Sequence, residues 1–284
     1  MHMPPWRVCR GEGALVAAAI HEGTAVREEL ASLLAVDPRT RRREEDPFTG
    51  AWTTIAPTRI VGCRSRFEVD LNRPPQKAVY LAPEDAWGLT VWREAPSEAL
   101  IEGSRALHRD FFAAAGELLS EQARNHGRVV VFDLHSYNHR RGGPGAPFDP
   151  PEANPEINVG TRGLDERRWG RVVAAFMEAV EDFDFEAAVK AAERRVEEDL
   201  SFSVGQWRGA RGRLDIRRDK RFRGGYFPAW INETFGASAC ALAIEVKKIF
   251  MDEWTGRLDE ALHQAIGEAL AAGARRVAEE LAIL

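Results

Sequence analysis

Three apolar stretches of the chain each end in, or carry, one polar side chain of a kind that binds metals or moves protons. These side chains are His21, His135 and Glu245. Burying an imidazole or a carboxylate beside an apolar core costs several kcal/mol unless the group is paired or bound to a metal. Two histidines with one carboxylate, leaving one coordination position open, form the pattern of a catalytic zinc site. Zinc at such a site lowers the pKa of a bound water and polarises a carbonyl, so the pattern favours a hydrolase.

The segment Asp133-Leu134-His135-Ser136 is the strongest of these three indications. It follows an apolar, β-branched run at 128–132, which is typical of a buried strand in an α/β sheet. A polar end to such a strand lies where the sheet opens into a crevice. We therefore expect His135 to be a metal ligand and Asp133 to be its hydrogen-bond partner. A strand-end histidine that is hydrogen-bonded in a loop is the alternative at this position.

Strands and helices alternate along the chain, which indicates α/β architecture. Hydrophobic patterning predicts strands over residues 14–20, 53–63, 67–71, 129–134, 157–161, 214–217 and 240–246. It predicts helices over residues 25–36, 95–126, 164–180, 185–200 and about 253–284, with Ser97 as the cap of the second helix. We expect a three-layer sandwich of phosphorylase/hydrolase-like type, with a central mixed, largely parallel sheet flanked by helices.

Glycines, prolines and charges indicate where the chain forms loops. Residues 39–50 are charged and include Pro47, so we expect a loop there. Residues 142–158 are rich in proline and glycine, and an irregular loop of this length is uncommon unless it is functional or disordered. Neither a repeat nor a clean linker interrupts the chain. We therefore expect residues 1–284 to form a single metallohydrolase domain that ends in a long amphipathic helix at about 253–284.

The charge balance argues against a nucleic-acid partner. The 284 residues carry a formal net charge of −5, and the sequence pI is about 5.9. Arginines nevertheless cluster at 39–43, 140–141 and 208–223. Such clusters are usually solvated surface, but one that lies beside a cleft could hold an anionic substrate.

The spacing of the cysteines and the length of the apolar runs indicate in which cellular compartment the protein works. Cys9, Cys63 and Cys240 are widely spaced and form no CxxC pair, so neither a disulfide framework nor a cysteine zinc site is expected. No segment is apolar enough to span a membrane, and the short apolar run at 14–20 does not have the form of a signal peptide. We therefore expect a cytoplasmic protein with no membrane partner.

Short motifs follow one another in a recognisable order along most of the chain. They are His21-Glu22-Gly23, Glu45-Asp46-Pro47-Phe48-Thr49, Val69-Asp70-Leu71-Asn72-Arg73-Pro74, Asp133-Leu134-His135-Ser136, Phe222-Arg223-Gly224-Gly225-Tyr226 and Ala243-Ile244-Glu245-Val246. In this order they resemble the N-formylglutamate amidohydrolase family, which is related to the zinc carboxypeptidases and the aspartoacylases. The Asp-Leu-Asn-Arg and Asp-x-His-Ser motifs together carry most of the resemblance. The loop at 137–158 departs from the family, and we expect it to shape the substrate pocket.

The resemblance implies a set of metal ligands and a general base. His21 and His135 would bind one zinc ion, and the third ligand would be a carboxylate of the Glu45-Asp46 pair. We prefer Asp46, because the family uses an aspartate at about this distance; Glu45 is the rival, and Glu22 is a weaker option. Glu245 would be the general base that activates the attacking water.

The resemblance also implies how the substrate is held. Arg73, with Asn72, would bind a substrate carboxylate, because a guanidinium fork matches a carboxylate bidentately. Arg66 could assist, and Ser136 would also lie at the substrate. Gly224 and Gly225 would let the backbone approach the ligand closely.

These roles together describe a zinc-dependent amidohydrolase. It would cleave the N-formyl or N-acyl bond of a small carboxylate-bearing amide, such as an N-acyl amino acid, or act on a peptide end. One alternative is a non-catalytic relative that binds an anionic ligand or a peptide in the same cleft. A carboxypeptidase-like enzyme is a further alternative.

Overall fold

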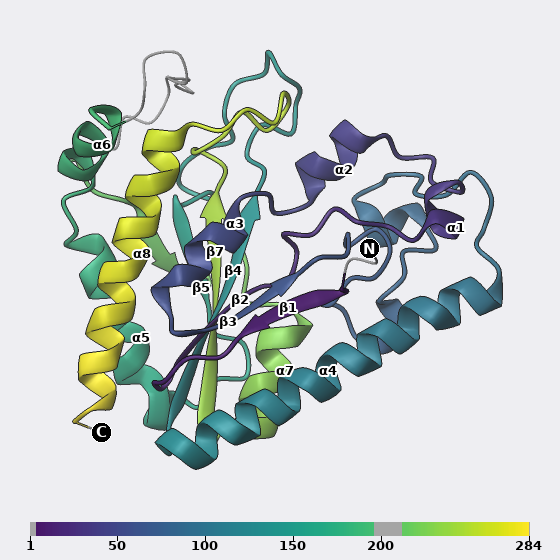
Figure 1. Cartoon of the computed structure of the whole chain (residues 1–284). Coiled ribbons are helices and arrows are strands. Elements are labelled where there is room, and N and C mark those ends of the chain that lie inside the picture. The colour runs from purple at the N-terminus through teal and green to yellow at the C-terminus, as the bar shows by residue number, and fades with distance from the viewer. Residues whose placement is uncertain (1–3, 196–211, 284) are drawn as a thin grey trace.

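A seven-stranded sheet forms the centre of the structure, a computed structural model that describes residues 4–195 and 212–283 (Figure 1). The strands, in chain order, are β1 Trp6–Cys9, β2 Leu15–Ala19, β3 Thr58–Gly62, β4 Val129–Tyr137, β5 Ile157–Gly160, β6 Ile216–Arg218 and β7 Ala239–Lys247. In space they follow the order β1-β3-β2-β4-β7-β5-β6.

Most neighbouring strands of this sheet are parallel. β3, β2, β4 and β7 lie side by side and run in the same direction. β1 pairs antiparallel with β3, β5 pairs antiparallel with β7, and β6 runs parallel to β5. The predicted mixed, largely parallel sheet is therefore confirmed.

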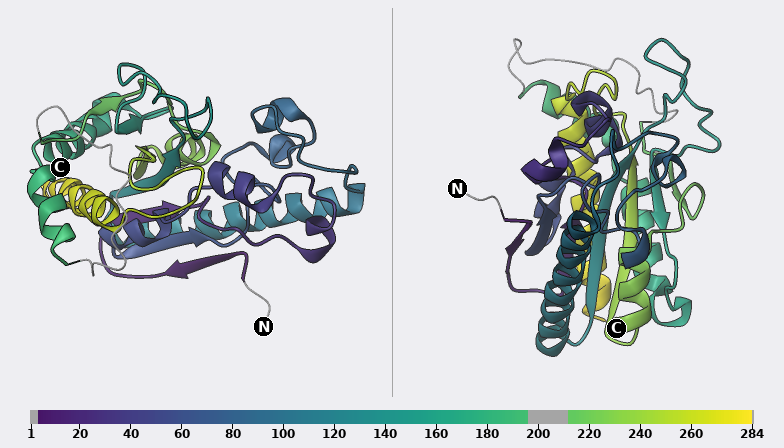
Figure 2. Two further views of the ribbon diagram at one scale, coloured as in Figure 1. Left: turned by 90° about the horizontal axis from the view of Figure 1, so that it is seen from above. Right: turned by 90° about the vertical axis from the view of Figure 1, so that its right-hand side faces the viewer.

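Helices cover both faces of the sheet and complete the predicted three-layer sandwich (Figure 2). They are α1 Glu28–Ala31, α2 Pro38–Glu44, α3 Thr49–Trp52, α4 Glu98–His126, α5 Glu166–Glu181, α6 Phe185–Glu193, α7 Tyr226–Phe235 and α8 Glu260–Leu281. Three 3₁₀ turns, η1 Thr53–Ile55, η2 Pro75–Lys77 and η3 Pro83–Ala86, join them. None of the helices in the described part of the chain is both long and apolar enough to cross a membrane.

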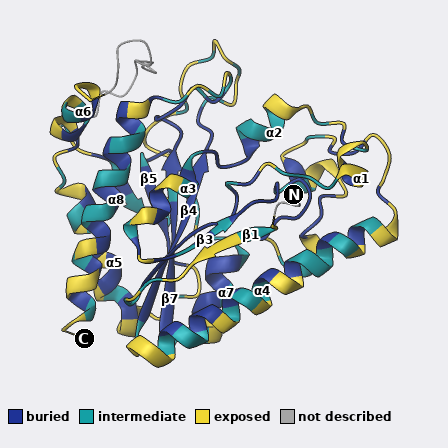
Figure 3. Ribbon diagram, in the orientation of Figure 1, coloured by how far each residue is buried: buried dark blue, intermediate teal, exposed yellow. Residues whose placement is uncertain are grey.

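The central strand β4 shows why a continuous apolar run predicts a strand that is buried on both faces. Val130 and Phe132 pack on one face of the sheet, in a core shared with α5, α6 and α8. Val129 and Val131 pack on the other face, in a core shared with α4 and α7. Because helices cover both faces, every position of the run is apolar and buried (Figure 3).

The prediction of a loop over residues 39–50 is wrong. Residues 38–44 form α2, since Asp37 accepts hydrogen bonds from the backbone N–H groups of Arg39 and Thr40, and Pro38 occupies the first helical position. Within this charged run Arg39 is exposed, Arg41, Arg42 and Arg43 are half-buried, and Glu44 is buried. Residues 49–52 then form the short helix α3.

The C-terminal helix begins later than predicted. It starts at Glu260 rather than near residue 253, because Asp259 caps it by accepting a hydrogen bond from the backbone N–H of Leu262 over 3.0 Å. Residues 252–258 form a turn before it, closed by pairing of Met251 with Leu258. Ser97 caps the start of α4, as predicted, by accepting a hydrogen bond from the backbone N–H of Leu100.

Three further predictions need correction. Only residues 28–31 of the expected helix 25–36 are helical, and residues 67–71 lie in turns instead of a strand. The sequence also did not indicate α7. Residues 196–200 of the expected helix 185–200, and the first residues of the arginine cluster at 208–223, lie outside the described residues.

Candidate metal centre

Three side chains with metal-binding atoms meet at the carboxyl ends of β2 and β4. His21 follows β2, His135 lies in β4, and Asp46 lies between α2 and α3. Because β2 and β4 are parallel neighbours, their carboxyl ends open on the same side of the sheet. The backbone N–H of Asp46 donates to the carbonyl oxygen of His21 over 3.0 Å, which holds the third residue beside the first.

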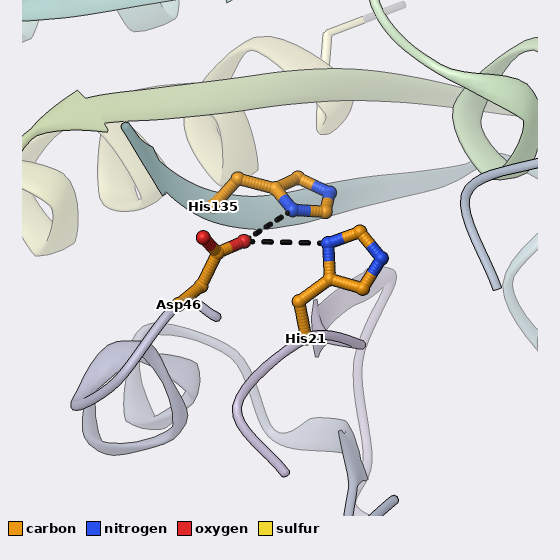
Figure 4. Close-up of side chains that lie close together, drawn as sticks. All are labelled: His21, Asp46 and His135. Carbon is orange, nitrogen blue, oxygen red and sulfur yellow. Dashed lines mark hydrogen bonds and ion pairs between the residues drawn. The ribbon is translucent and has the colours of Figure 1, made fainter. Parts of the chain in front are cut away.

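One carboxylate oxygen of Asp46 faces both imidazoles (Figure 4). Its Oδ2 atom lies 2.9 Å from Nδ1 of His135 and 3.4 Å from Nδ1 of His21. One ligand atom from each of the three residues lies within 4.8 Å of the other two, and all three side chains are buried. Two imidazoles and a carboxylate are a donor set that zinc accepts.

A second carboxylate holds the far side of each imidazole. Nε2 of His21 donates to Oδ1 of Asp70 over 2.8 Å, and Nε2 of His135 donates to Oδ2 of Asp133 over 2.9 Å. A proton on Nε2 leaves the lone pair of Nδ1 directed at the shared space in front of Asp46. Carboxylates of this kind commonly fix the tautomer and orientation of metal-binding histidines.

The charges and the unpaired atoms of this cluster fit a cation. Nδ1 of His21 is buried and makes no hydrogen bond to any described residue. Burial opposes the ionisation of Asp46, but the neighbouring imidazoles of His135 and His21 outweigh it and hold the pKa of Asp46 well below its usual range. The pKa of Asp70 is also held well below its usual range, since Arg66 and His21 outweigh the effect of burial. The cluster therefore directs negative charge and an unpaired imidazole nitrogen at one point.

The two rival carboxylates point elsewhere. The carboxylate of Glu45 accepts a hydrogen bond from the hydroxyl of Ser65. The carboxylate of Glu22 accepts one from the backbone N–H of Gly50 over 2.9 Å. Among the described residues, Asp46 is the acid that groups with the two histidines.

Glu245 stands beside this cluster on the neighbouring strand. In the parallel pairing of β4 with β7 it is the direct partner of His135. It lines the same cavity, and loss of hydration raises the pKa of Glu245 to about 7, while His135 opposes this shift and Asp46 adds to it. A carboxylate with a pKa near neutrality suits a general base.

A cavity of about 760 Å³ includes the metal-binding cluster in its lining. This volume suits a small-molecule ligand. The lining is rich in arginine, namely Arg66, Arg73, Arg141, Arg162, Arg221 and Arg223. An anionic substrate is the natural counterpart of such a lining.

Arg66 has no free fork for a substrate. Its Nε donates to the hydroxyl of Tyr80 over 3.1 Å, its Nη2 to Asp70 over 3.0 Å, and its Nη1 to the carbonyl oxygen of Glu44 over 3.3 Å. Tyr80 also donates to Asp70. The geometry therefore favours Arg66 as a support for Asp70 over its predicted role at the substrate.

Asn72 and Gly225 organise the start of α7. The side-chain oxygen of Asn72 accepts from the backbone N–H of Phe227, and its carbonyl oxygen accepts from that of Tyr226, both over 3.0 Å. A Cβ atom on Gly225 would lie only 2.3 Å from Oδ1 of Asn72. The absence of a side chain at Gly225 therefore leaves room for the side chain of Asn72. The sequence had instead predicted that a ligand approaches the backbone here. Gly224, with φ of 102°, lines the cavity beside it.

Other predicted substrate residues do face the cavity. The side chain of Arg73 is 44% exposed, and its Nε lies 3.8 Å from Asp70, beyond hydrogen-bond distance. Ser136 places its hydroxyl 3.4 Å from Oδ1 of Asp46. Arg73 therefore keeps its guanidinium fork available.

Two further cavity arginines, Arg162 and Arg223, were not among the predicted substrate residues, although Arg223 lies in the arginine cluster at 208–223. The backbone N–H of Arg162 donates to the carbonyl oxygen of Arg223 over 2.7 Å, so the two segments are joined. Both side chains are exposed, and neither guanidinium group forms an ion pair within the described part of the chain. Arg223 belongs to a motif of the resemblance, whereas Arg162 carries no signal beyond its place after a strand. Asp70 and Tyr80 were missed as supports because their roles depend on contacts distant in sequence.

The histidines lie at the carboxyl ends of parallel strands, which is where open α/β sheets bind their ligands. The family model of N-formylglutamate amidohydrolase matches residues 13–251. Because this match covers most of the chain, the protein belongs to the N-formylglutamate amidohydrolase family, as the motifs predicted. Its class of activity is accordingly that of an amidohydrolase.

Solved structures share this fold. An N-formylglutamate amidohydrolase from Ralstonia eutropha JMP134 is 16% identical in sequence to this chain. The superposition covers 99% of this chain and 99% of that protein, with a TM-score of 0.71. The gene product Atu2144 from Agrobacterium tumefaciens is 18% identical, covers 93% of this chain and 94% of its own, and has a TM-score of 0.55. No curated protein sequence matches the chain.

Proposed function

We propose that this amidohydrolase binds one zinc ion and cleaves an N-formyl or N-acyl amide bond of a small carboxylate-bearing substrate, such as an N-acyl amino acid. The convergence of His21, Asp46 and His135 on one point supports this proposal most directly. The cavity that contains them is lined by arginines, which supports an anionic substrate.

The residues of the chain would divide the chemistry between them. His21, Asp46 and His135 would hold the zinc ion, with Asp70 and Asp133 fixing the two imidazoles. When bound, zinc lowers the pKa of water and polarises a carbonyl. Glu245 accepts a proton from the attacking water and passes it to the nitrogen of the leaving amine. Its pKa of about 7 suits both transfers.

The substrate carboxylate would be held by the arginines with available forks. Arg73 is the first candidate, and Arg162 and Arg223 lie on the other segments that line the cavity. Ser136 lies beside Asp46 and would contact the reacting end of the substrate. A substrate oriented from its carboxylate would present the amide carbonyl to the zinc site.

Metal analysis combined with a substrate panel tests this proposal. We expect the purified protein to contain about one zinc per chain and to release amines from N-formyl or N-acetyl amino acids. The variants His135→Ala and Glu245→Gln should both lose activity, and only the first should lose zinc. Ligand binding without turnover of any substrate would indicate the non-catalytic alternative. Release of C-terminal residues from peptides would indicate the carboxypeptidase-like alternative.

We also propose the cytoplasmic location that the cysteines suggest. Cys9, Cys63 and Cys240 are all free thiols, and Cys63 and Cys240 are buried. Unpaired cysteines are usual in a reducing compartment. Fractionation of the native source, followed by detection of the protein, tests this location.

A further inference from the structure

A buried lysine lies next to the metal-binding cluster. Lys248 follows the end of β7 and is 1% exposed. Its ammonium donates to the carbonyl oxygen of Arg43 over 2.5 Å, to that of Glu45 over 2.8 Å, and to Oδ1 of Asn138 over 3.1 Å. An ammonium group has three donors, so none remains for a substrate. Although Lys248 lines the cavity, its contacts are with the protein.

The three acceptors lie on segments that carry the reactive side chains. Arg43 and Glu45 precede Asp46, and Asn138 follows His135 by three positions. Lys248 itself follows Glu245 by three positions. One ammonium therefore connects the segment of the carboxylate ligand to the strand of a histidine ligand and to the strand of the general base.

Asp46 needs such support because it does not lie in a strand or a helix. It follows the end of α2, and Phe48, two residues later, has a left-handed backbone with φ of 71°. The backbone N–H of Asp46 donates to the carbonyl oxygen of His21, but the segment lies in no continuous ladder of strand or helix hydrogen bonds. Charge-assisted hydrogen bonds from Lys248 to the carbonyl oxygens of Arg43 and Glu45 add to its fixation.

Arg43 and Glu253 form a second connection between the same segments. The guanidinium group of Arg43 lies 3.1 Å from the carboxylate of Glu253. That carboxylate also accepts from the backbone N–H groups of His139 and Arg140, each over 2.9 Å. The chain after His135 and the chain before Asp46 are thus held together from two sides.

We propose that Lys248 is a positioning residue, which fixes the Asp46 segment against His135 and thereby sets the affinity of the site for its metal. This inference rests on the proposed zinc function. The competing explanation is a buried lysine that stabilises the fold and leaves the geometry of Asp46 unaffected. The two explanations differ in what happens to zinc affinity when the protein remains folded.

The preceding lysine provides a matched control. Lys247 is also buried, and its ammonium donates to the carbonyl oxygen of Asn154, which lies in the loop after β4 and not beside Asp46. Lys248→Met and Lys247→Met each remove one buried ammonium and keep most of the unbranched side chain. Zinc affinity is measured on the metal-free proteins by competition with a chelator, and folding is checked by circular dichroism.

We expect Lys248→Met to bind zinc about 10–100-fold more weakly, as is typical when a support of a metal ligand is lost. Lys247→Met should bind zinc as the wild type does. Equal affinity in wild type and Lys248→Met, or an equal loss in both variants, would overturn the role of Lys248. If the wild type binds no zinc, the proposed function fails instead.

A milder variant keeps the test decisive if Lys248→Met does not fold. Asn138→Ala removes the contact of Lys248 with the His135 strand and leaves its two contacts with the Asp46 segment. We expect a smaller loss of zinc affinity, of a few-fold, in a folded protein. Unchanged affinity in Asn138→Ala would then contradict the proposal.

Discussion

His135 and Glu245 are direct partners in the pairing of β4 with β7, so an imidazole of the metal-binding cluster and the proposed base lie on adjacent strands. Strand pairing fixes this relationship, and no flexible loop has to bring the two groups together. Because loss of hydration raises its pKa to about 7, Glu245 can both accept and release a proton near neutral pH.

Replacement of Glu245 by glutamine should separate catalysis from metal binding. The amide has nearly the same size but cannot accept the proton, so we expect kcat to fall by about 10²–10⁴-fold. Zinc content should remain that of the wild type, because Glu245 is not in the ligand cluster. Kinetics and metal analysis on the same preparation check both parts, and unchanged kcat would exclude Glu245 as the base.

The pH dependence of kcat/KM in the wild type should report the ionisation of Glu245. Glu245 acts as a base only when ionised, so kcat/KM should decrease as the pH falls through its pKa. Burial raises this pKa to about 7 in the metal-free protein, and a bound cation would lower it. We expect the acidic limb between the ordinary glutamate value of about 4.3 and 7. The residual activity of Glu245→Gln should lack this limb.

Asp70→Asn should lower both the stability of the protein and the zinc affinity of the site. Asp70 accepts from His21 and from Arg66, and a neutral amide would leave the buried guanidinium without its counter-charge. We expect a loss of about 3–5 kcal/mol in the free energy of unfolding and about 10–100-fold in zinc affinity. Urea unfolding and chelator competition measure the two effects. Tyr80→Phe, which removes one neutral donor to Asp70, should cost much less.

Arg73→Gln should affect substrate binding and leave the chemistry intact. A charge-assisted hydrogen bond contributes about 1.5–3 kcal/mol, so we expect KM to rise roughly 10–100-fold with little change in kcat. Arg275→Gln, on the exposed surface of α8 and outside the cavity lining, provides the control. If the Arg73 variant has the KM of the wild type, Arg162 and Arg223 become the candidates that bind the substrate carboxylate.

Gly225→Ala should destabilise the protein by steric conflict alone. The backbone of Gly225, with φ of −86°, is open to alanine, but the new Cβ would lie 2.3 Å from Oδ1 of Asn72. We expect a loss of about 1–3 kcal/mol, typical of overpacking. Gly145→Ala, where a Cβ meets no atom within 4 Å, should be neutral in the same thermal unfolding experiment.

The sequence predicted those parts of the fold whose signal is local. β4 and β7 were evident because strands buried on both faces are apolar throughout. α2 was missed because its residues are charged, although Asp37 and Pro38 are typical of a helix start. α8 was predicted to begin about seven residues too early, since the turn before Asp259 contains apolar residues as well.

The choice between Asp46 and Glu45 illustrates what sequence alone does not determine. The two residues are adjacent after the end of α2, and their side chains meet different partners. Asp46 faces the imidazoles, and Glu45 faces Ser65. The resemblance favoured Asp46 from its spacing.

The buried contacts of Lys248 could not be predicted from the sequence either. A lysine after a strand usually lies in solvent, and its three acceptors here are far away in sequence.

The segments that meet around Asp46 are distant along the chain, and this has a consequence for folding. Asp46 and His135 are 89 residues apart, and Lys248 lies 203 residues from Glu45. Such contacts exist only after β2, β4 and β7 have paired, which is a late and slow event. Zinc would therefore enter a folded chain, unlike the metal of a zinc finger, which drives folding. It would leave the refolding rate unchanged and slow the unfolding rate, so the bound metal would protect the enzyme kinetically.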